Sequence, residues 1–188
     1  AECDRARRKA ETKEDFLASI NVIEQQGNKM NTLIEQLLSL TRIQQGTEKC
    51  PLRVCDLSGF VDACCDEFVP ADERGMTLET DIEPGVAAAY NPSLLSRAMF
   101  NLMQNAYKYG REGGNIRVSL CWENGCAVIS VKDDGPGIPK AEQEKIWQRF
   151  YRCDTSRAEG GTGLGLSLVR EIALVHLSLI HISEPTRL

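Results

Sequence analysis

Two glycine-rich turns constrain the fold of this chain more than any other feature. The first spans residues 133–138 with the sequence DDGPGI, and the second spans residues 161–166 with the sequence GTGLGL. Glycine admits backbone conformations and close approaches that a side chain would obstruct. Two such turns in one small domain therefore favour a nucleotide that is held from two sides.

A helix is predicted just upstream of the first turn. Asn91 and Pro92 are typical of an N-cap and a first helical position, and we expect the helix to run to about Tyr109 and to end at Gly110. Its expected core stripe is Leu95, Ala98, Met99, Leu102 and Ala106.

Asn101 and Asn105 are the residues of this helix best suited to a ligand. Their four-residue spacing sets both carboxamides on one face, where the oxygens suit Mg²⁺ and its phosphates. Arg97 and Lys108 extend the same polar stripe. An ordinary solvated helix surface gives the same pattern, so that alternative stays open.

The remaining periodicity predicts mixed α and β structure. Apolar residues alternate from Ile116 to Trp122 and from Ala127 to Val131, and Asn124-Gly125 between them favours a tight hairpin of antiparallel strands. We also expect a helix from Asp56 or Ser58 to about Phe68, a half-buried strand over residues 76–82, and a helix from about Gly163 through Val175.

Each turn suits one part of a nucleotide. Asp133 is able to accept a hydrogen bond from an amino group such as that of adenine, and the second turn opens a helix whose N–H groups attract phosphate. Neither a P-loop nor a dinucleotide fingerprint is present. Arg152 and Arg157 lie in or beside a predicted mobile loop and are equally explained as phosphate contacts or as surface arginines.

The amino-acid composition narrows the classes of protein to which this chain could belong. The 22 lysines and arginines against 27 aspartates and glutamates give a formal net charge of -5, which disfavours a nucleic-acid partner. The sequence carries no apolar run long enough to span a membrane. Eight cysteines without paired CxxC spacing are expected to be reduced thiols in the cytoplasm.

Residues 14–45 are predicted to form one long amphipathic helix. Apolar residues recur in four-residue and three-residue steps from Phe16 to Leu37, and additional leucines broaden the stripe. The breadth favours a helical bundle whose other helices come from another subunit. Docking of the stripe on the globular part of the same chain is the alternative.

Four segments together resemble the histidine-kinase ATPase family. RAMFNLMQNAYKYG is similar to its N box, VKDDGPGIP to its G1 box, IWQRFYRCDTSR to its F box, and GGTGLGLSLVREI to its G2 box. The resemblance implies the Bergerat ATP-binding fold, an α/β two-layer sandwich with a mixed sheet, preceded by a bundle helix. It implies a partial phosphotransfer bundle over residues 1–47, an ATP-binding domain over 48–176, and an atypical tail over 177–188.

The resemblance also implies roles for individual residues. Asn105 would bind Mg²⁺, Asn101 and Lys108 would act near the phosphates, and Asp133 would receive the adenine amino group. The remaining residues implied in ATP binding are Tyr109, Gly135, Gly137, Ile138, Phe150, Arg152, Arg157, Thr162, Gly163, Leu164 and Gly165.

The implied activity is transfer of the γ-phosphate of ATP to a histidine, for relay to the receiver domain of a response regulator. Neither His176 nor His181 resembles the family's acceptor, so we expect a fragment that lacks the acceptor helix and two C-terminal strands and is not active alone. The complete protein would dimerise through its bundle and meet a membrane only through segments outside this sequence. A chaperone-, topoisomerase- or mismatch-repair-like ATPase and a non-catalytic nucleotide-binding module are the alternatives.

Overall fold

A computed structural model describes residues 12–45, 51–68, 74–153 and 161–176. The chain divides into two compact units, residues 1–41 and residues 42–188. Among the described residues, no helix is long and apolar enough to cross a membrane.

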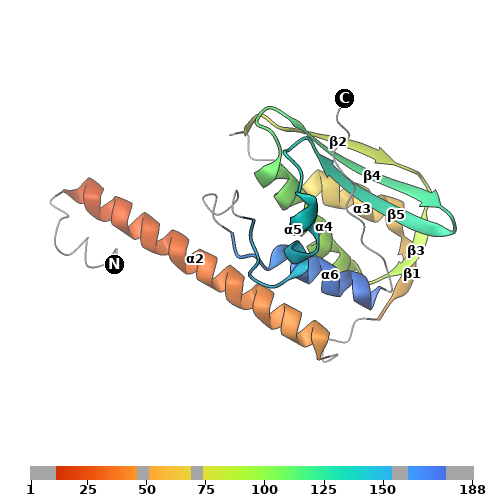
Figure 1. Ribbon diagram of the computed structural model, residues 1–188, viewed down its shortest axis with the longest axis horizontal. Coiled ribbons are helices and arrows are strands. Elements are labelled where there is room, and N and C mark those ends of the chain that lie inside the picture. Colours follow the sequence, from red (N-terminus) through yellow and green to blue (C-terminus); the bar gives the residue numbers. More distant parts are fainter. Residues whose placement is uncertain (1–11, 46–50, 69–73, 154–160, 177–188) are drawn as a thin grey trace. The chain divides into compact units, whose positions relative to one another are not determined.

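The described part of the first unit is formed by the long helix α2 (Lys13–Gln44), whose last residues belong to the second unit and which Figure 1 shows as one unbroken helix. Its start is fixed by a reciprocal cap, in which the Asp15 N–H donates to Thr12 Oγ1 and the Thr12 N–H donates to Asp15 Oδ2. The predicted helix of residues 14–45 is thus confirmed. Its apolar stripe is largely exposed, at Phe16, Ile20, Ile23, Met30, Ile34 and Leu37.

The second unit is built on a three-stranded mixed sheet. Strand β4 (Asn115–Glu123) lies between β2 (Thr77–Ile82), to which it is parallel, and β5 (Cys126–Asp133), to which it is antiparallel. Asn124 and Gly125 between β4 and β5 have φ of 52° and 82°, which is the geometry of the predicted tight hairpin. The mixed sheet of the predicted fold class is therefore present.

Four short elements were not predicted from the sequence. Strands β1 (Arg53–Asp56) and β3 (Ala87–Tyr90) pair antiparallel in a separate two-stranded sheet. The helix α5 (Lys140–Gln143) and the 3₁₀ turn η2 (Lys145–Trp147) follow the first glycine turn. They place the segment that leads to the second turn.

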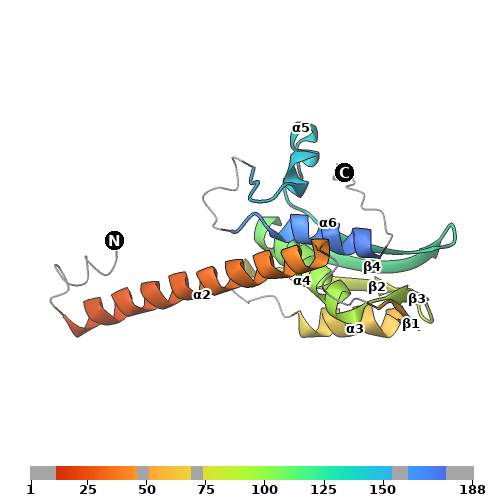
Figure 2. The same cartoon turned by 90° about the horizontal axis from the view of Figure 1, so that it is seen from below.

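Two helices cover the sheet and a third packs on one of them, as Figures 1 and 2 show. Helix α3 (Leu57–Glu67), capped by Asp56, and helix α4 (Pro92–Tyr109) contact the strands, whereas α6 (Gly165–Val175) packs on α4. Their shared core includes Val61, Met99, Met103, Val118 and Leu120. This is the expected two-layer arrangement.

The buried stripe of α4 differs in part from the predicted one. Leu94 and Met103 are buried, while the predicted Leu95 and Leu102 are only half-buried. The helix is rich in leucine and methionine on adjacent positions, so the sequence alone does not fix its rotation to within one residue. The rotation matters because it sets the polar face that carries Asn101 and Asn105.

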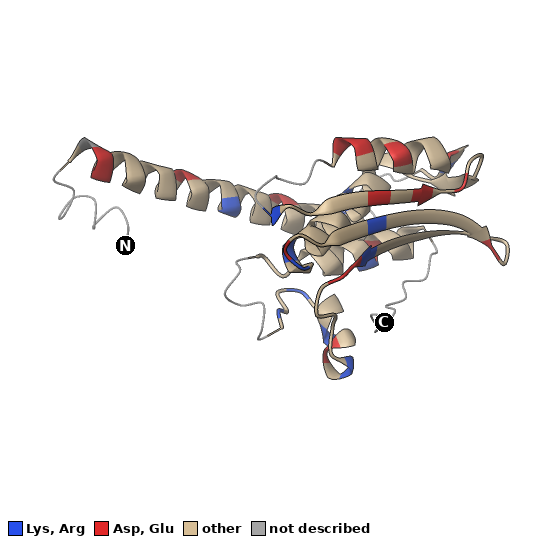
Figure 3. Cartoon of the chain, turned by 90° about the horizontal axis from the view of Figure 1, so that it is seen from above, with Lys and Arg blue, Asp and Glu red and all other residues tan. Residues whose placement is uncertain are grey.

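The negative charge of this unit gathers along α3 and β2, as Figure 3 shows. These elements carry Asp62, Asp66, Glu67, Glu79 and Asp81. The six cysteines within the described ranges are all free thiols, as predicted. Burial raises the pKa of Cys65 to about 11, which keeps this thiol protonated and unreactive at neutral pH.

Candidate functional site

Helix α4 is the element on which the predicted site residues meet. Its start is held by Asn91, whose Oδ1 accepts a hydrogen bond from the Leu94 N–H at 3.0 Å, and its end is Gly110. Asn101 and Asn105 lie on successive turns and are both half-buried. The structure confirms the helix, and the four-residue spacing keeps both residues on one side of it.

The second glycine turn closely approaches this face of α4. The Asn101 amide Nδ2 donates to the Arg97 carbonyl at 2.7 Å, and a Cβ placed on Gly165 would lie 2.8 Å from Asn101 Oδ1. A Cβ on Gly161 would likewise lie 2.8 Å from the Lys108 amine. Both ends of the turn thus pack against predicted ligand-binding side chains.

Gly163 holds the turn against the F-box segment. Its φ is +68°, and a Cβ at this position would lie 2.7 Å from the Phe150 carbonyl carbon. The Phe150 N–H donates to the Gly163 carbonyl at 2.9 Å, and Phe150 itself has a φ of 62°, which is unusual for a residue with a side chain. The backbones of Phe150 and Gly163 are therefore held against each other.

Residues 151–153 are connected to α5 through side chains that bind Glu142. The Tyr151 hydroxyl donates to the Glu142 carboxylate, and this bond lowers the pKa of Glu142. Arg152 is half-buried next to it. Arg157 and the predicted covering loop lie outside the described residues, so their roles stay predictions.

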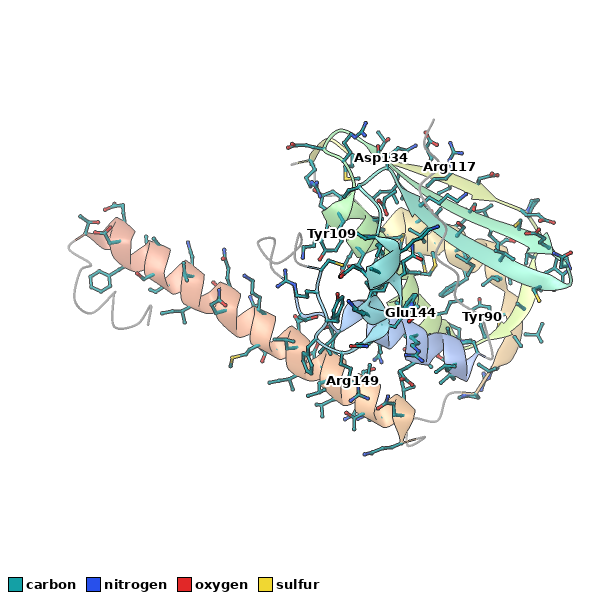
Figure 4. The ribbon with its side chains drawn as sticks, viewed as in Figure 1. Tyr90, Tyr109, Arg117, Asp134, Glu144 and Arg149 are labelled. Carbon is teal, nitrogen blue, oxygen red and sulfur yellow. The ribbon has the colours of Figure 1, made fainter. Side chains whose placement is uncertain are left out.

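The first glycine turn meets the C-terminal end of α4. Asp133 Oδ1 accepts a hydrogen bond from the Gly135 N–H at 2.9 Å, and a Cβ on Gly135 would lie 2.4 Å from the Tyr109 carbonyl oxygen. Gly137 has a φ of 70°. Only glycine at position 135 leaves room for the helix end beside Asp133, and Figure 4 shows Tyr109 and the neighbouring Asp134 at this end.

The carboxyl of Asp133 is electrostatically distinct. Partial burial raises its pKa, the Gly135 N–H lowers it, and the nearby Asp134 raises it further. A carboxylate that is partly desolvated interacts more strongly with a hydrogen-bond donor of a ligand than one in bulk water. This fits the expectation that Asp133 receives an amino group.

Lys108 and Tyr109 form a pair at the same end of the helix. The Lys108 amine donates to the Tyr109 hydroxyl at 3.1 Å and lies 4.8 Å from the centre of its ring. Because Gly161 packs on the same amine, this pair connects the end of α4 to the second turn. A positive charge is therefore held beside the second turn, one residue before Tyr109, whose carbonyl lies beside the first turn.

The start of α6 remains suited to an anion. Leu164 occupies its N-cap position without a side-chain cap, and the Leu164 N–H donates to Thr162 Oγ1 at 3.3 Å. N–H groups in the first turn of a helix attract negative charge. Thr162 and Gly165 thus flank the helix start expected to receive phosphate oxygens, while Ile138 lies in the first turn, where its carbonyl accepts from Gln143.

Two residues with structural roles at the site were not found from the sequence. Asp134 accepts hydrogen bonds from the Arg111 and Asn115 N–H groups, each at 3.1 Å, so the second acid of the first turn fixes the loop before β4. Arg74 binds carbonyls at the end of α4. Both bind backbone groups, for which no spacing rule exists in the sequence.

Comparison with known proteins gives a consistent result. Residues 90–187 match the family described as histidine kinase-, DNA gyrase B- and HSP90-like ATPase. The chain is 37% identical over 161 residues to the sensor histidine kinase RppB of Synechocystis sp., covering 84% of this chain and 36% of RppB. It is 35% identical over 165 residues to the sensor-like histidine kinase SenX3 of Mycolicibacterium smegmatis, covering 85% and 43%.

Solved structures agree on the fold. The mycobacterial sensor histidine kinase MprB superposes with a TM-score of 0.57 at 29% identity, over 66% of this chain and 80% of that one. Full-length ShkA in complex with AMPPNP gives a TM-score of 0.73 at 22% identity, over 87% and 34%. The chain spans less than half of the length of the curated relatives RppB and SenX3.

Proposed function

Because the chain belongs to the family of histidine kinase-, DNA gyrase B- and HSP90-like ATPases, we propose that it is the ATP-binding catalytic part of a sensor histidine kinase. In this proposal it transfers the γ-phosphate of ATP to a histidine, and a response regulator receives the phosphate next. The observation that carries the proposal is the convergence of both glycine turns on one face and one end of α4.

The convergence supports a division of labour along α4. At its C-terminal end, Asp133 would accept a hydrogen bond from the adenine amino group, with Gly135 and Gly137 shaping the turn that forms this part of the pocket. Asn101, nearer the middle of α4, and Lys108, at its end, face the second turn, where the phosphates would meet the start of α6. Phosphoryl transfer needs positioning and charge neutralisation above all, and this arrangement supplies both.

The residues on this face also fit a magnesium ion. Asn101 and Asn105 offer hard amide oxygens, and the described residues contain no group of three or more His, Cys, Asp or Glu side chains that would form a dedicated metal cage. Mg²⁺ typically takes one or two protein ligands and completes its shell with phosphates and water. Asn105 would hold the ion, which would neutralise phosphate charge when bound.

The accepting histidine is not His176 in this proposal. Its Nε2 accepts from the Asn91 N–H at 3.0 Å, and its Nδ1 lies 2.7 Å from the Ile172 carbonyl at the end of α6. This ring is therefore engaged in holding α6 against the start of α4. His181 lies outside the described residues.

The partners follow from the same proposal. The exposed apolar stripe of α2 would pack in a helical bundle with a second copy, and the receiver domain of a response regulator would take the phosphate from the histidine. We propose a cytoplasmic site of action, because the ATP substrate is supplied there. The domain boundaries after residues 47 and 176 also stay proposals.

Incubation with γ-labelled ATP and a separately purified histidine-bearing bundle from a related kinase tests the proposal. Acid-labile label on the bundle, lost in the Asn105→Ala variant, is the expected result. Release of free phosphate without labelled bundle would instead favour an ATPase of the chaperone or topoisomerase kind. A folded protein that fails to bind Mg²⁺-ATP would favour a non-catalytic module.

A further inference from the structure

The end of α4 has an unusual partner from outside the helix. The last four carbonyls of a helix find no partner within it and normally turn to water or to a following glycine motif. Here the Arg74 guanidinium donates to the Lys108 carbonyl at 2.6 Å and to the Gly110 carbonyl at 2.8 Å, and also to the Tyr107 carbonyl. One side chain thus satisfies three acceptors.

Arginine is well suited to this position. Its planar guanidinium presents several N–H groups in a fixed fork, and its charge complements the negative end of the helix dipole. The guanidinium carbon also lies 5.6 Å from the centre of the Tyr107 ring, and the Arg74 carbonyl accepts from the Gly113 N–H at 2.8 Å. Arg74 is therefore fixed at both its backbone and its side chain.

The carbonyl that Arg74 does not bind points to the site. Of the carbonyl oxygens from Tyr107 to Gly110, that of Tyr109 lies beside Gly135. A Cβ placed on Gly135 would lie 2.4 Å from this oxygen. The peptide units on either side of Tyr109 are held by Arg74. The direction of the Tyr109 carbonyl, and with it the seat of the first glycine turn, therefore depends on Arg74.

The same contacts act on Lys108. Its carbonyl is bound by Arg74 on one side of the backbone, while its amine lies against Gly161 and the Tyr109 hydroxyl. A rotation of this last turn would move the amine away from the second glycine turn. A misplacement of about 1 Å is enough to cost a site much of its efficiency.

We propose that Arg74 is a positioning residue of the nucleotide site, which sets Lys108 and Tyr109 by holding the carbonyls of the last turn of α4. The effect of Arg74 on nucleotide binding rests on the proposed function. Its effect on the end of α4 does not depend on a ligand. Arg74 would not contact the nucleotide and would act through the helix end alone.

The test uses Arg74→Ala and Arg74→Lys in the whole chain, with two controls. Arg117→Ala removes an equal charge from the ion pair with Glu79, which lies on the strands and not on α4. Ser58→Ala removes a buried hydroxyl that binds the Glu83 carbonyl and the Val86 N–H, so it lowers stability without touching α4. Amide hydrogen exchange of the ligand-free protein and Mg²⁺-ATP affinity are measured for each.

We expect Arg74→Ala to speed exchange at residues 107–111 and 135 and to weaken Mg²⁺-ATP binding about tenfold, with Arg74→Lys between it and the parent. Both controls should keep the parent affinity. Unchanged exchange at the end of α4 would overturn the proposal, and so would a loss of affinity in Ser58→Ala equal to that in Arg74→Ala.

Failure of the proposed function gives a different pattern. If the parent protein binds no nucleotide while Arg74→Ala still loosens residues 107–111, the nucleotide role of both Arg74 and the site is overturned and only the helix clamp stands. If the parent binds Mg²⁺-ATP and Arg74→Ala binds it equally well, the proposed function stands and the positioning role is overturned.

Discussion

Helices α2 and α4 are both amphipathic, but they use their apolar faces differently. Met103 on α4 is fully buried in the core of its own unit, whereas Met30 on α2 is 62% exposed. The apolar face of α4 is satisfied within the chain, which leaves its polar face free to form a site. The apolar face of α2 carries exposed side chains such as Phe16, Ile20 and Ile34, and this fits a helix that packs in a bundle with a second copy.

The ends of the two helices differ in the same way. The start of α2 is fixed by Thr12 and Asp15, which are three residues apart in the sequence. Helix α4 also has a local cap, at Asn91, but distant residues bind both of its ends, His176 at the first and Arg74 at the second. The position of α4 therefore depends on the rest of its unit.

Substitution of matched methionines gives the largest contrast. Met103→Ala should lower the free energy of unfolding by about 2–5 kcal/mol, because it leaves a cavity among buried side chains, whereas Met30→Ala should change it by less than about 0.5 kcal/mol. Urea denaturation followed by tryptophan fluorescence measures both. Equal losses would show that Met30 contributes to a packed core as much as Met103 does.

Matched asparagines compare the polar faces. Asn105→Ala should reduce phosphoryl transfer to a histidine-bearing bundle by about 100-fold or more, since it removes the amide oxygen that we propose binds the metal. Asn31→Ala on the exposed face of α2 makes the same chemical change and should leave the rate unaltered. Transfer from γ-labelled ATP is the assay, and full activity in Asn105→Ala would remove this residue from the site.

Matched glycines come next in size. Gly135→Ala should weaken Mg²⁺-ATP binding about tenfold, because the new methyl group would displace the Tyr109 carbonyl and Asp133 from each other. At Gly27 in α2 nothing lies within 4 Å, so Gly27→Ala should instead favour the helix by about 0.5–1 kcal/mol. Titration calorimetry and circular dichroism measure the two effects, and a Gly135→Ala protein with parent affinity would contradict the packing described.

The smallest effect is a pH dependence at Asp133. Its pKa is raised by partial burial, so the folded protein favours the protonated carboxyl. The stability contributed by this group is present at low pH and is lost as the pH rises through the raised pKa. As the pH rises through that pKa, the free energy of unfolding of Asp133→Asn should therefore increase relative to that of the parent. Parallel curves of the free energy of unfolding against pH for the two proteins would refute the assignment.

The helices and the central hairpin could be predicted from the sequence because their determinants are local. Asn124 and Gly125 both need a positive φ, and Asn91 with Pro92 marks a helix start. Strands β1 and β3 were missed because they are short and β3 begins with three alanines. Their pairing, such as Val54 with Ala89, joins segments far apart in the chain.

The glycine turns and asparagines of the candidate site could be predicted from the sequence. The residues that hold the backbone around them could not. Asp134 looks equivalent to Asp133 in the sequence, yet it binds the loop before β4, because only the folded chain brings the Arg111 and Asn115 N–H groups to it. Arg74 was missed for the same reason. Side chains that bind distant backbone groups leave no periodic pattern to read.

Amide chemical-shift mapping with Mg²⁺-ATP is the sharpest test of a nucleotide site built around α4. We expect resonances from residues 101–109, 133–138 and 161–168 to shift together along one binding curve, while those of residues 16–38 in α2 do not move. Shifts confined to one of the three segments, or separate binding curves for the two glycine turns, would contradict a single site.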